Sequence, residues 1–196
     1  MPTPPPSPPR LILASGSPRR RQLLQEAGYT FDVHPADIDE SSYPRDLEPD
    51  QVPLHLATAK ALIVAQQFPH DIILAADTVV VLGNHLLGKP RDAIDARRML
   101  TDLAGTTHHC VTAVAIVHRG STRTAVVTSA VHMRPLGEAE IDAYIASGRW
   151  EGKAGGYGIQ DDDPFVTRMD GSLTNIVGLP MDESRALLRN VGVEPA

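Results

Sequence analysis

The sequence is poor in the features that mark secreted, membrane and nucleic-acid-coating proteins. Its 196 residues include a single cysteine, Cys110, so no internal disulfide can form, and we expect a buried thiol. Aromatic residues make up 4% and the formal net charge is −6, which argues against a duplex DNA or anionic membrane partner. The longest apolar run, residues 72–82, is interrupted by Asp77 and is shorter than the roughly 20 residues of a membrane span. If the protein binds phosphate groups, it must therefore do so through a small cluster of basic residues and not through a broad basic surface.

The N-terminal segment MPTPPPSPPR contains six prolines and no apolar stretch. It predicts a disordered proline-rich tail over residues 1–9 and not a signal peptide. The 42% hydrophobic and 21% charged residues of the chain are typical of a globular protein. We therefore expect a single domain over residues 10–196 in the cytoplasm.

Apolar periodicity and turn residues predict alternating strands and helices. Strands are expected at 11–15, 31–33, 72–82, 107–118, 123–133 and near 165–169. Helices are expected from Pro18 to a stop at Gly28 with Ser17 as N-cap, at 51–68, at 92–103, around Ile141–Ile145 and after Pro180. Gly83-Asn84 predicts a hairpin. This order favours an α/β fold with a mixed sheet.

The segment SGSPRRR at 15–21 places three arginines in the first turn of a predicted helix. The helix macrodipole is already positive there, so the arrangement is locally unfavourable unless a polyphosphate binds. The alternative is a solvated basic turn, and Arg21 is expected to face solvent or pair with an acid. The segment therefore indicates an anion site.

Asp77 lies in the middle of a β-branched strand, where an unpaired buried carboxylate is costly. It needs a partner or a chemical role, and the alternative is a structural aspartate bonded to backbone or to an arginine. Lys89, after the predicted hairpin, could fold back beside Asp77, although a lysine before proline is usually a surface residue. Asp77 is therefore a candidate site residue.

The segment EGKAGGYGIQ at 151–160 contains four glycines, which permit close backbone approach to a ligand. Neither GxxxxGK[ST] nor a GxGxxG after a strand is present, so neither a P-loop nor a dinucleotide-binding fold is indicated. The eight histidines lack metal-binding spacing and are expected to be surface or strand residues, not zinc ligands.

Six segments together are more specific: LILASGSPRR, DIDE, AADTVV, GKP, GKAGGYGIQ and GSLTNIVGLP. Their order and spacing resemble the Maf family of nucleotide pyrophosphatases over residues 10–190. The resemblance implies a Maf/ITPase-like mixed sheet with two lobes flanking a central cleft, and often a homodimer. It also implies a divalent cation, Mg²⁺ or Mn²⁺, and hydrolysis of a nucleoside triphosphate to the monophosphate and pyrophosphate in nucleotide-pool house-cleaning.

The resemblance also implies roles for individual residues. Asp77 would accept the proton of the attacking water and, with Glu40, hold the cation. Without the family, Glu40 is equally well a solvent-facing loop acid. The side chains expected to contact or neutralise the triphosphate are Ser15, Arg20, Lys60, Lys89 and Lys153, of which Lys60 and Lys89 are assigned to catalysis.

Three positions point to a branch of the family. Arg19, Thr78 and Gln160 match the branch that acts on dTTP and UTP, whereas a similar branch that prefers 7-methylguanosine triphosphate has tryptophan, glutamine and glutamate there. A Gln amide can both donate to and accept from the edge of a pyrimidine. The expected substrates are therefore dTTP, UTP or modified pyrimidine nucleotides. One departure is the run Asp161–Asp163, where the family usually places glycine, and its role is open.

Two other classes of function stay open. The first is a nucleotide-binding regulator of cell division or septum formation without turnover, which needs the cleft but not Asp77 as a base. The second is a phosphopeptide or nucleic-acid adaptor that uses SPRRR, which the acidic net charge and low aromatic content disfavour.

Overall fold

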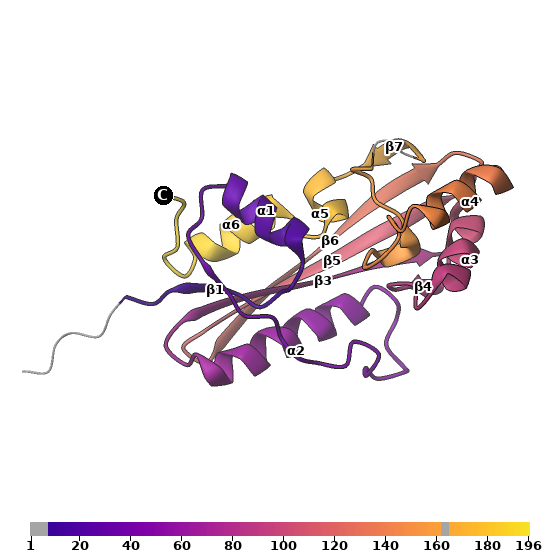
Figure 1. Cartoon of the computed structure of the whole chain (residues 1–196). Helices are drawn as coiled ribbons and strands as arrows, with labels where there is room; N and C mark the ends of the chain where they lie inside the picture. The colour runs from indigo at the N-terminus through magenta and orange to yellow at the C-terminus, as the bar shows by residue number, and fades with distance from the viewer. Residues whose placement is uncertain (1–7, 162–164) are drawn as a thin grey trace, which may run out of the picture.

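The computed structural model describes residues 8–161 and 165–196, and it contains one seven-stranded mixed sheet with helices on both faces (Figure 1). The strands are β1 (Leu11–Leu13), β2 (Asp32–Val33), β3 (Ile72–Leu82), β4 (His85–Leu87), β5 (Thr107–His118), β6 (Ser121–Met133) and β7 (Val166–Asp170). The helices are α1 (Pro18–Glu26), α2 (Val52–Gln67), α3 (Ala93–Leu103), α4 (Glu138–Ala146), α5 (Leu173–Val177) and α6 (Met181–Arg189), with one 3₁₀ turn, η1 (Ala154–Gly156). The predicted α/β class with a mixed sheet is confirmed.

The sheet has the order β2-β1-β3-β5-β6-β7, and β4 also pairs with β3. β1 is parallel to both β2 and β3, whereas the remaining pairs are antiparallel. β3, β5 and β6 contain 11, 12 and 13 residues and run through the whole molecule. These three strands form the rigid frame on which the other elements are placed.

The outer edge of β3 is covered by two different strands with a gap between them. β1 pairs with residues 72–74, and β4 pairs with residues 80–82. Within the described chain, residues 75–79 therefore have no strand partner on this side, although β5 pairs with them on the other. Asp77 and Thr78 lie in this gap, and successive side chains of a strand point to opposite faces. Both faces of the sheet are therefore accessible from one opening.

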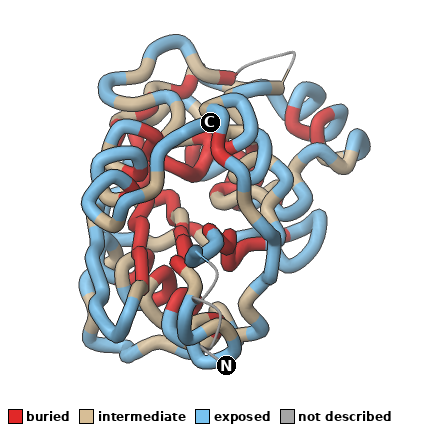
Figure 2. Tube along the Cα trace, turned by 90° about the vertical axis from the view of Figure 1, so that its left-hand side faces the viewer, coloured by how far each residue is buried: buried red, intermediate tan, exposed pale blue. Residues whose placement is uncertain are grey.

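The apolar core is divided by the sheet. On one face α1 and α6 bury Leu24 and Leu188 against the strands. On the other face, the small side chains of Ala57 and Ala61 let α2 pack close to β3 and β5. A third cluster, which includes Leu100 of α3, fills the end of the molecule near β4. Figure 2 shows buried segments along the centre of the trace and exposed loops around it.

Most predicted elements are present, with differences at their ends. Ser17 caps α1, and Gly28, with φ of +82°, follows its last turn as predicted. β1 ends at Leu13, two residues early, because the chain turns out of the sheet after Ala14 N–H donates to Leu74 O at 2.8 Å. The five-residue α5 was not predicted, since a helix this short has too few positions to show periodicity.

Two segments discussed above lie mostly outside the described residues and are not tested by the structure. The disordered tail over residues 1–9 lies almost wholly outside them, as do Asp162 and Asp163. No helix among the described residues is both long and apolar enough to cross a membrane.

Candidate active site

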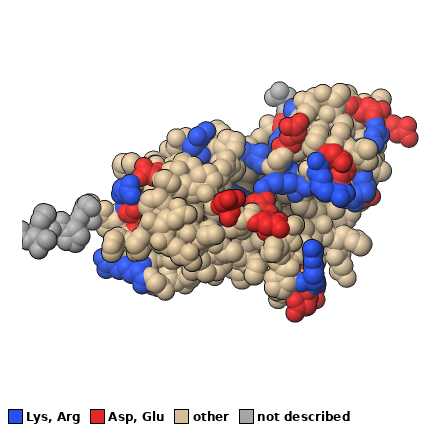
Figure 3. Space-filling model, turned by 60° about the horizontal axis from the view of Figure 1, so that its bottom comes forward, with Lys and Arg blue, Asp and Glu red and all other residues tan. Residues whose placement is uncertain are grey.

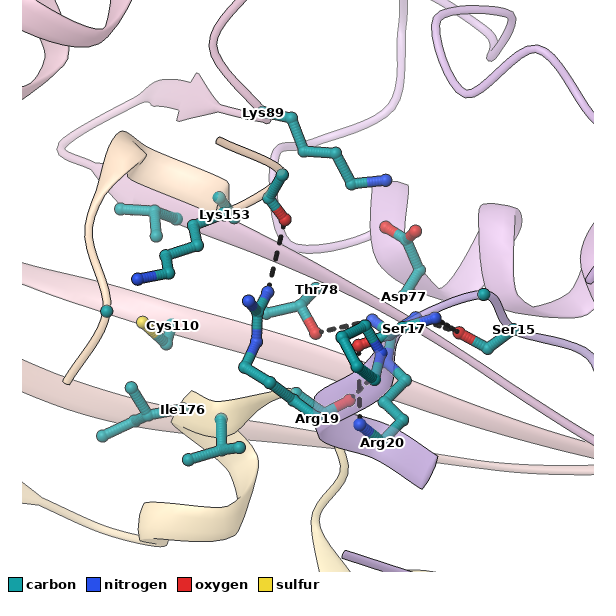
Figure 4. Close-up of a pocket in the computed structure, with 18 of the residues that line it drawn as sticks. Ser15, Ser17, Arg19, Arg20, Asp77, Thr78, Lys89, Cys110, Lys153 and Ile176 are labelled. Carbon is teal, nitrogen blue, oxygen red and sulfur yellow. Dashed lines mark hydrogen bonds between the residues drawn. The ribbon is translucent and has the colours of Figure 1, made fainter. Parts of the chain in front are cut away.

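A cavity of about 430 Å³ opens at the gap in the edge of β3 (Figure 4). The structure brings all ten predicted site residues to its wall: Ser15, Arg19, Arg20, Glu40, Lys60, Asp77, Thr78, Lys89, Lys153 and Gln160. Two sides can be distinguished. We call Ser15, Arg20, Glu40, Lys60, Asp77 and Thr78 the strand side, and residues 151–161 the loop side.

The cavity is cationic although the chain is acidic. Among the described residues, five Lys or Arg side chains line it against three Asp or Glu, in a protein whose formal net charge is −6. On the face shown in Figure 3, basic side chains form a band from the centre toward the right of the view, and acidic side chains lie beside it. The cavity therefore has a local excess of basic side chains, as binding of a small polyanion requires.

A chain of ion pairs surrounds Asp77. Lys60 Nζ, from α2, donates to Asp77 Oδ1 at 2.5 Å and to Glu40 Oε1 at 2.7 Å. Lys89 Nζ donates to Glu40 Oε2 at 2.5 Å. Lys89 and Asp77 line the same cavity, but among the described residues they form no direct ion pair. Lys60 pairs with Asp77 instead, so Lys89 is linked to Asp77 through Glu40 and Lys60.

The two carboxylates differ in acidity. Burial raises the pKa of Asp77, which is 6% exposed, and the charges of Lys60 and Arg20 oppose this rise only in part. Burial also raises the pKa of Glu40, but hydrogen bonds from Lys60 and Lys89 outweigh it and bring the pKa to about 2. Glu40 therefore stays anionic, and Asp77 is the stronger proton acceptor of the two.

Arg20 is held by neutral oxygens from three elements. Its Nε donates to Gly178 O at 2.7 Å, Nη1 to Ser15 Oγ at 3.2 Å and Nη2 to Thr78 Oγ1 at 3.0 Å. Burial lowers the pKa of this guanidinium, yet arginine stays charged in proteins. No carboxylate of the described residues pairs with it, so its charge at the start of α1 is left for a ligand.

Two residues that sequence reasoning missed lie behind Arg20. Thr112 Oγ1 donates to Asn175 O at 2.9 Å and lies 3.0 Å from Thr78 Oγ1. Since a hydroxyl has only one hydrogen, Thr78 must donate to Thr112 while it accepts from Arg20. The order of donors is thus fixed from Arg20 to the backbone of α5. The only local sign of this role in the sequence was that Thr112 is a polar residue in an otherwise apolar strand.

On the loop side, the charged groups are paired differently. Arg19 Nη2 donates to Gly152 O at 3.2 Å, across the cavity. Lys153 Nζ donates to both carboxylate oxygens of Asp161, at 2.6 and 2.9 Å, so its charge is already balanced. Gln160 is exposed, lines the cavity and makes no side-chain hydrogen bond with another described residue.

A buried polar cluster anchors the loop side to the sheet. His108 Nε2 and Tyr157 Oη share a hydrogen bond of 2.6 Å, and Cys110 Sγ lies 3.9 Å from the same hydroxyl. Burial raises the pKa of Cys110 to about 12, in agreement with the predicted buried thiol. Burial lowers the pKa of His108 to about 4, and its Nδ1 is buried without a partner among the described residues. The histidine is therefore neutral.

The residues present can accommodate a divalent cation only in part. Asp77 Oδ2 accepts no hydrogen bond from the described residues, and the Glu40 carboxylate lies on the same lysine. Carboxylate oxygens are the ligands that Mg²⁺ and Mn²⁺ prefer. The described residues contain no group of three or more His, Cys, Asp or Glu side chains that could hold a metal alone. Two carboxylates fit a cation whose other ligands are water and substrate phosphate.

Comparisons with known proteins agree with this geometry. A model of the Maf-like protein family matches residues 10–191. A protein of Anaeromyxobacter dehalogenans named dTTP/UTP pyrophosphatase is 49% identical over 189 residues, which cover 94% of this chain and 95% of that protein. Proteins of the same name from Cereibacter sphaeroides and Caulobacter vibrioides are 47% and 45% identical, over 93% and 95% of this chain and 95% and 98% of their own. With a match over nearly its whole length, the chain belongs to the Maf family.

Proposed function

We propose that this chain is a nucleoside triphosphate pyrophosphatase that hydrolyses dTTP and UTP, or modified pyrimidine nucleotides, to the monophosphate and pyrophosphate. The observation that carries the proposal is a buried carboxylate of raised pKa, Asp77, in the same cavity as Arg20, which makes no ion pair with a carboxylate of the described residues. The names of the relatives support the choice of substrates. The reaction serves to clear surplus or modified nucleotides.

The residues of the strand side fit the steps of this reaction. Arg20 and the N-terminus of α1 bind the polyphosphate, and Lys60 and Lys89 approach it from the side of α2 and β4. Asp77 takes a proton from the water that attacks the α-phosphorus, and the bond to the β-phosphate oxygen breaks. Pyrophosphate leaves with the electron pair of that bond. Lys60 remains beside Asp77 and stabilises its charged form before the transfer.

A divalent cation completes the proposal. Glu40 and Asp77 would hold Mg²⁺ or Mn²⁺ together with phosphate oxygens of the substrate. When bound, the cation supplies charge neutralisation of the triphosphate and of the leaving group.

Base selection is assigned to the loop side. Thr78 already bonds Arg20 and Thr112, and Arg19 bonds Gly152 O, so in this structure they act as supports. Gln160 is the member of the predicted trio whose amide makes no hydrogen bond with the described residues. We therefore assign reading of the pyrimidine edge chiefly to Gln160, whose amide can donate and accept there.

A nucleotide panel tests the proposal. Pyrophosphate release is measured with dTTP, UTP, dATP, dGTP and 7-methylguanosine triphosphate in the presence of Mg²⁺ or Mn²⁺, and dTTP and UTP should be the best substrates. Gln160→Glu should weaken this preference by roughly 5- to 150-fold, because an acceptor that the bound base covers and leaves without a donor costs about 1–3 kcal/mol. Gln25→Glu, on the exposed face of α1, is the matched control.

Two outcomes would change the assignment. If 7-methylguanosine triphosphate is the best substrate, the role of Arg19, Thr78 and Gln160 is wrong while the pyrophosphatase activity stands. If no triphosphate is hydrolysed but dTTP binds in calorimetry, the nucleotide-binding regulator of cell division replaces the enzyme.

Family membership also leads us to propose a homodimer in the cytoplasm. Light scattering coupled to gel filtration measures the first, and cell fractionation measures the second.

A further inference from the structure

The turn that carries Gln160 is short and closed. Asp161 N–H donates to Gly158 O at 3.1 Å, so Ile159 and Gln160 form the tip of the turn, and both line the cavity. A closed turn of this size lets its tip residues move little relative to its ends. The groups that hold Gly158 and Asp161 in place therefore determine the position of the Gln160 backbone.

The carboxylate of Asp161 fixes one end. It accepts both hydrogen bonds from Lys153 Nζ and a further one from Tyr144 Oη of α4. The side chains of Lys153 and Asp161 are only 15% and 12% exposed, so this ion pair is screened less than a surface pair. Tyr144 is buried and packs edge-to-face on Phe165 with ring centres 4.9 Å apart. The turn is thus tied to a rigid helix.

The other end lies directly beneath the same ion pair. A Cβ placed on Gly158 would lie 2.7 Å from Lys153 Nζ and 2.9 Å from Asp161 Oδ1, closer than packed atoms approach. Any larger residue here would force the ion pair to shift away from the backbone. Gly158, Lys153, Asp161 and Tyr144 therefore form one packed unit, from which Gln160 projects without a side-chain hydrogen bond to the described residues.

We propose that Asp161 is a positioning residue for base selection: through Lys153 and Tyr144 it holds the turn that presents Gln160 to the substrate base. The inference rests on the proposed function, since it concerns the base that Gln160 reads. It also changes the role of Lys153, because its ammonium group pairs with Asp161 and does not neutralise the triphosphate. Loss of Asp161 therefore loosens selection and at the same time releases a cation into the cavity.

These two effects together distinguish loss of base selection from a general loss of folded protein. In Asp161→Ala, the ratio of kcat/KM for dTTP to kcat/KM for dGTP should fall by roughly 10-fold, while KM for both triphosphates stays constant or decreases. Asp161→Asn keeps an acceptor for Tyr144, so its ratio of kcat/KM for dTTP to kcat/KM for dGTP should lie between those of Asp161→Ala and wild type. Tyr144→Phe removes only the hydroxyl and should shift the ratio in the same direction by about 3-fold.

The experiment combines kinetics with a measurement that needs no substrate. Pyrophosphate release on dTTP and dGTP gives the ratio, and hydrogen exchange of the amides of residues 158–161 reports whether the turn opens more often. Asp170→Asn is the matched control, since Asp170 accepts from Arg168 and His132 far from the cavity. It should leave both measurements at their wild-type values.

The result that supports the proposal is a lower ratio with faster exchange in Asp161→Ala. An unchanged ratio overturns it, including the case in which both activities fall equally because less protein is folded. If wild type itself shows no pyrimidine preference, the proposed specificity fails and the selection role of Asp161 fails with it, while the exchange rates still decide whether Asp161 holds the turn.

Discussion

The strand side and the loop side of the cavity are built in different ways. On the strand side, every charged group is held at 2.5 to 3.2 Å by partners from other elements, such as Lys60 of α2 on Asp77 of β3. On the loop side, the ion pair of Lys153 and Asp161 joins two residues of one glycine-rich segment. Chemistry common to all triphosphates is thus placed around β3, on side chains that join it to α1, α2 and the segment of Glu40. The groups that discriminate between bases lie on a segment that can vary without disturbing this arrangement.

The sharpest test of the strand side is Asp77→Asn. The amide keeps the shape of the side chain but cannot take a proton, so turnover of every substrate should fall by roughly 10²- to 10⁴-fold. The measurement is kcat for pyrophosphate release, with a thermal melt to verify folding.

The matched control for this change is Asp71→Asn at the start of the same region, where the carboxylate pairs with Arg10. It should retain activity. If Asp77→Asn kept more than about a tenth of the wild-type rate, another group would have to be the base.

The next largest effect concerns the anchor of the loop side. Burial lowers the pKa of His108 from 6.5 to about 4, so the folded state binds this proton less well than the unfolded state. The stability that follows is complete above pH 6.5 and is lost as the pH falls toward 4, by about 3 kcal/mol. Urea unfolding from pH 7 to pH 4 measures it.

In His108→Gln, this part of the pH dependence should disappear and the two stability curves should converge at low pH. The matched control is His55→Gln, at an exposed histidine of α2 that is not among the groups shifting the pKa of His108, and it should keep the wild-type slope. Parallel curves for wild type and His108→Gln would show that the loop side is not anchored by a neutral histidine.

A third comparison uses neighbouring arginines. Arg20→Ala removes the buried charge at the start of α1 and should lower kcat/KM by roughly 100-fold, through KM and, where the contact tightens in the transition state, through kcat. Arg21→Ala, on the exposed side of the same turn, should change kcat/KM little. The melting temperature of Arg20→Ala should fall, because the loss of its hydrogen bonds to Gly178 O, Ser15 and Thr78 outweighs the gain from removing a cation at a helix N-terminus. Equal kcat/KM values for the two variants would favour the alternative interpretation, in which the arginines form a solvated basic turn without a role in substrate binding.

The smallest predicted effect lies behind Arg20. Thr112→Val removes the hydroxyl that accepts from Thr78, at a cost of about 1 kcal/mol, so kcat/KM should fall by roughly 5-fold for all triphosphates alike. Thr112→Ser restores the hydroxyl and should restore the rate. A change in the ratio of dTTP to dGTP hydrolysis would mean that the strand side also reads the base.

How far the sequence predicts the site depends on where each signal is located. Asp77 is conspicuous because a carboxylate in a β-branched run is locally anomalous. Thr112 is not, since threonine is common in strands, and its role depends on Thr78 and Asn175, which are 34 and 63 residues away.

The pairings of the predicted residues were also beyond the sequence. The long strands and the capped α1 could be predicted because each carries its own periodicity and end signals. The pairing of Lys153 with Asp161 depends on how the glycine-rich segment turns, and three of its glycines, among them Gly155 with φ of +71°, adopt positive φ, where local patterns give little guidance. The same limit explains why the ion pair of Lys89 with Glu40 could not be predicted.

The gap in the edge of β3 has a consequence for how the length of this chain can change. Because Asp77 faces α2 and Thr78 faces α1, one residue inserted between Leu74 and Asp77 would exchange the two faces. Two inserted residues would restore the faces but move the carboxylate about 7 Å along the strand, out of reach of Lys60. The turn at Gly83-Asn84 is also constrained, because its length sets the register of β4 on β3 and thereby the position of Lys89. The site therefore fixes the length of β3, and we expect insertions and deletions to be tolerated only outside β3 and its hairpin.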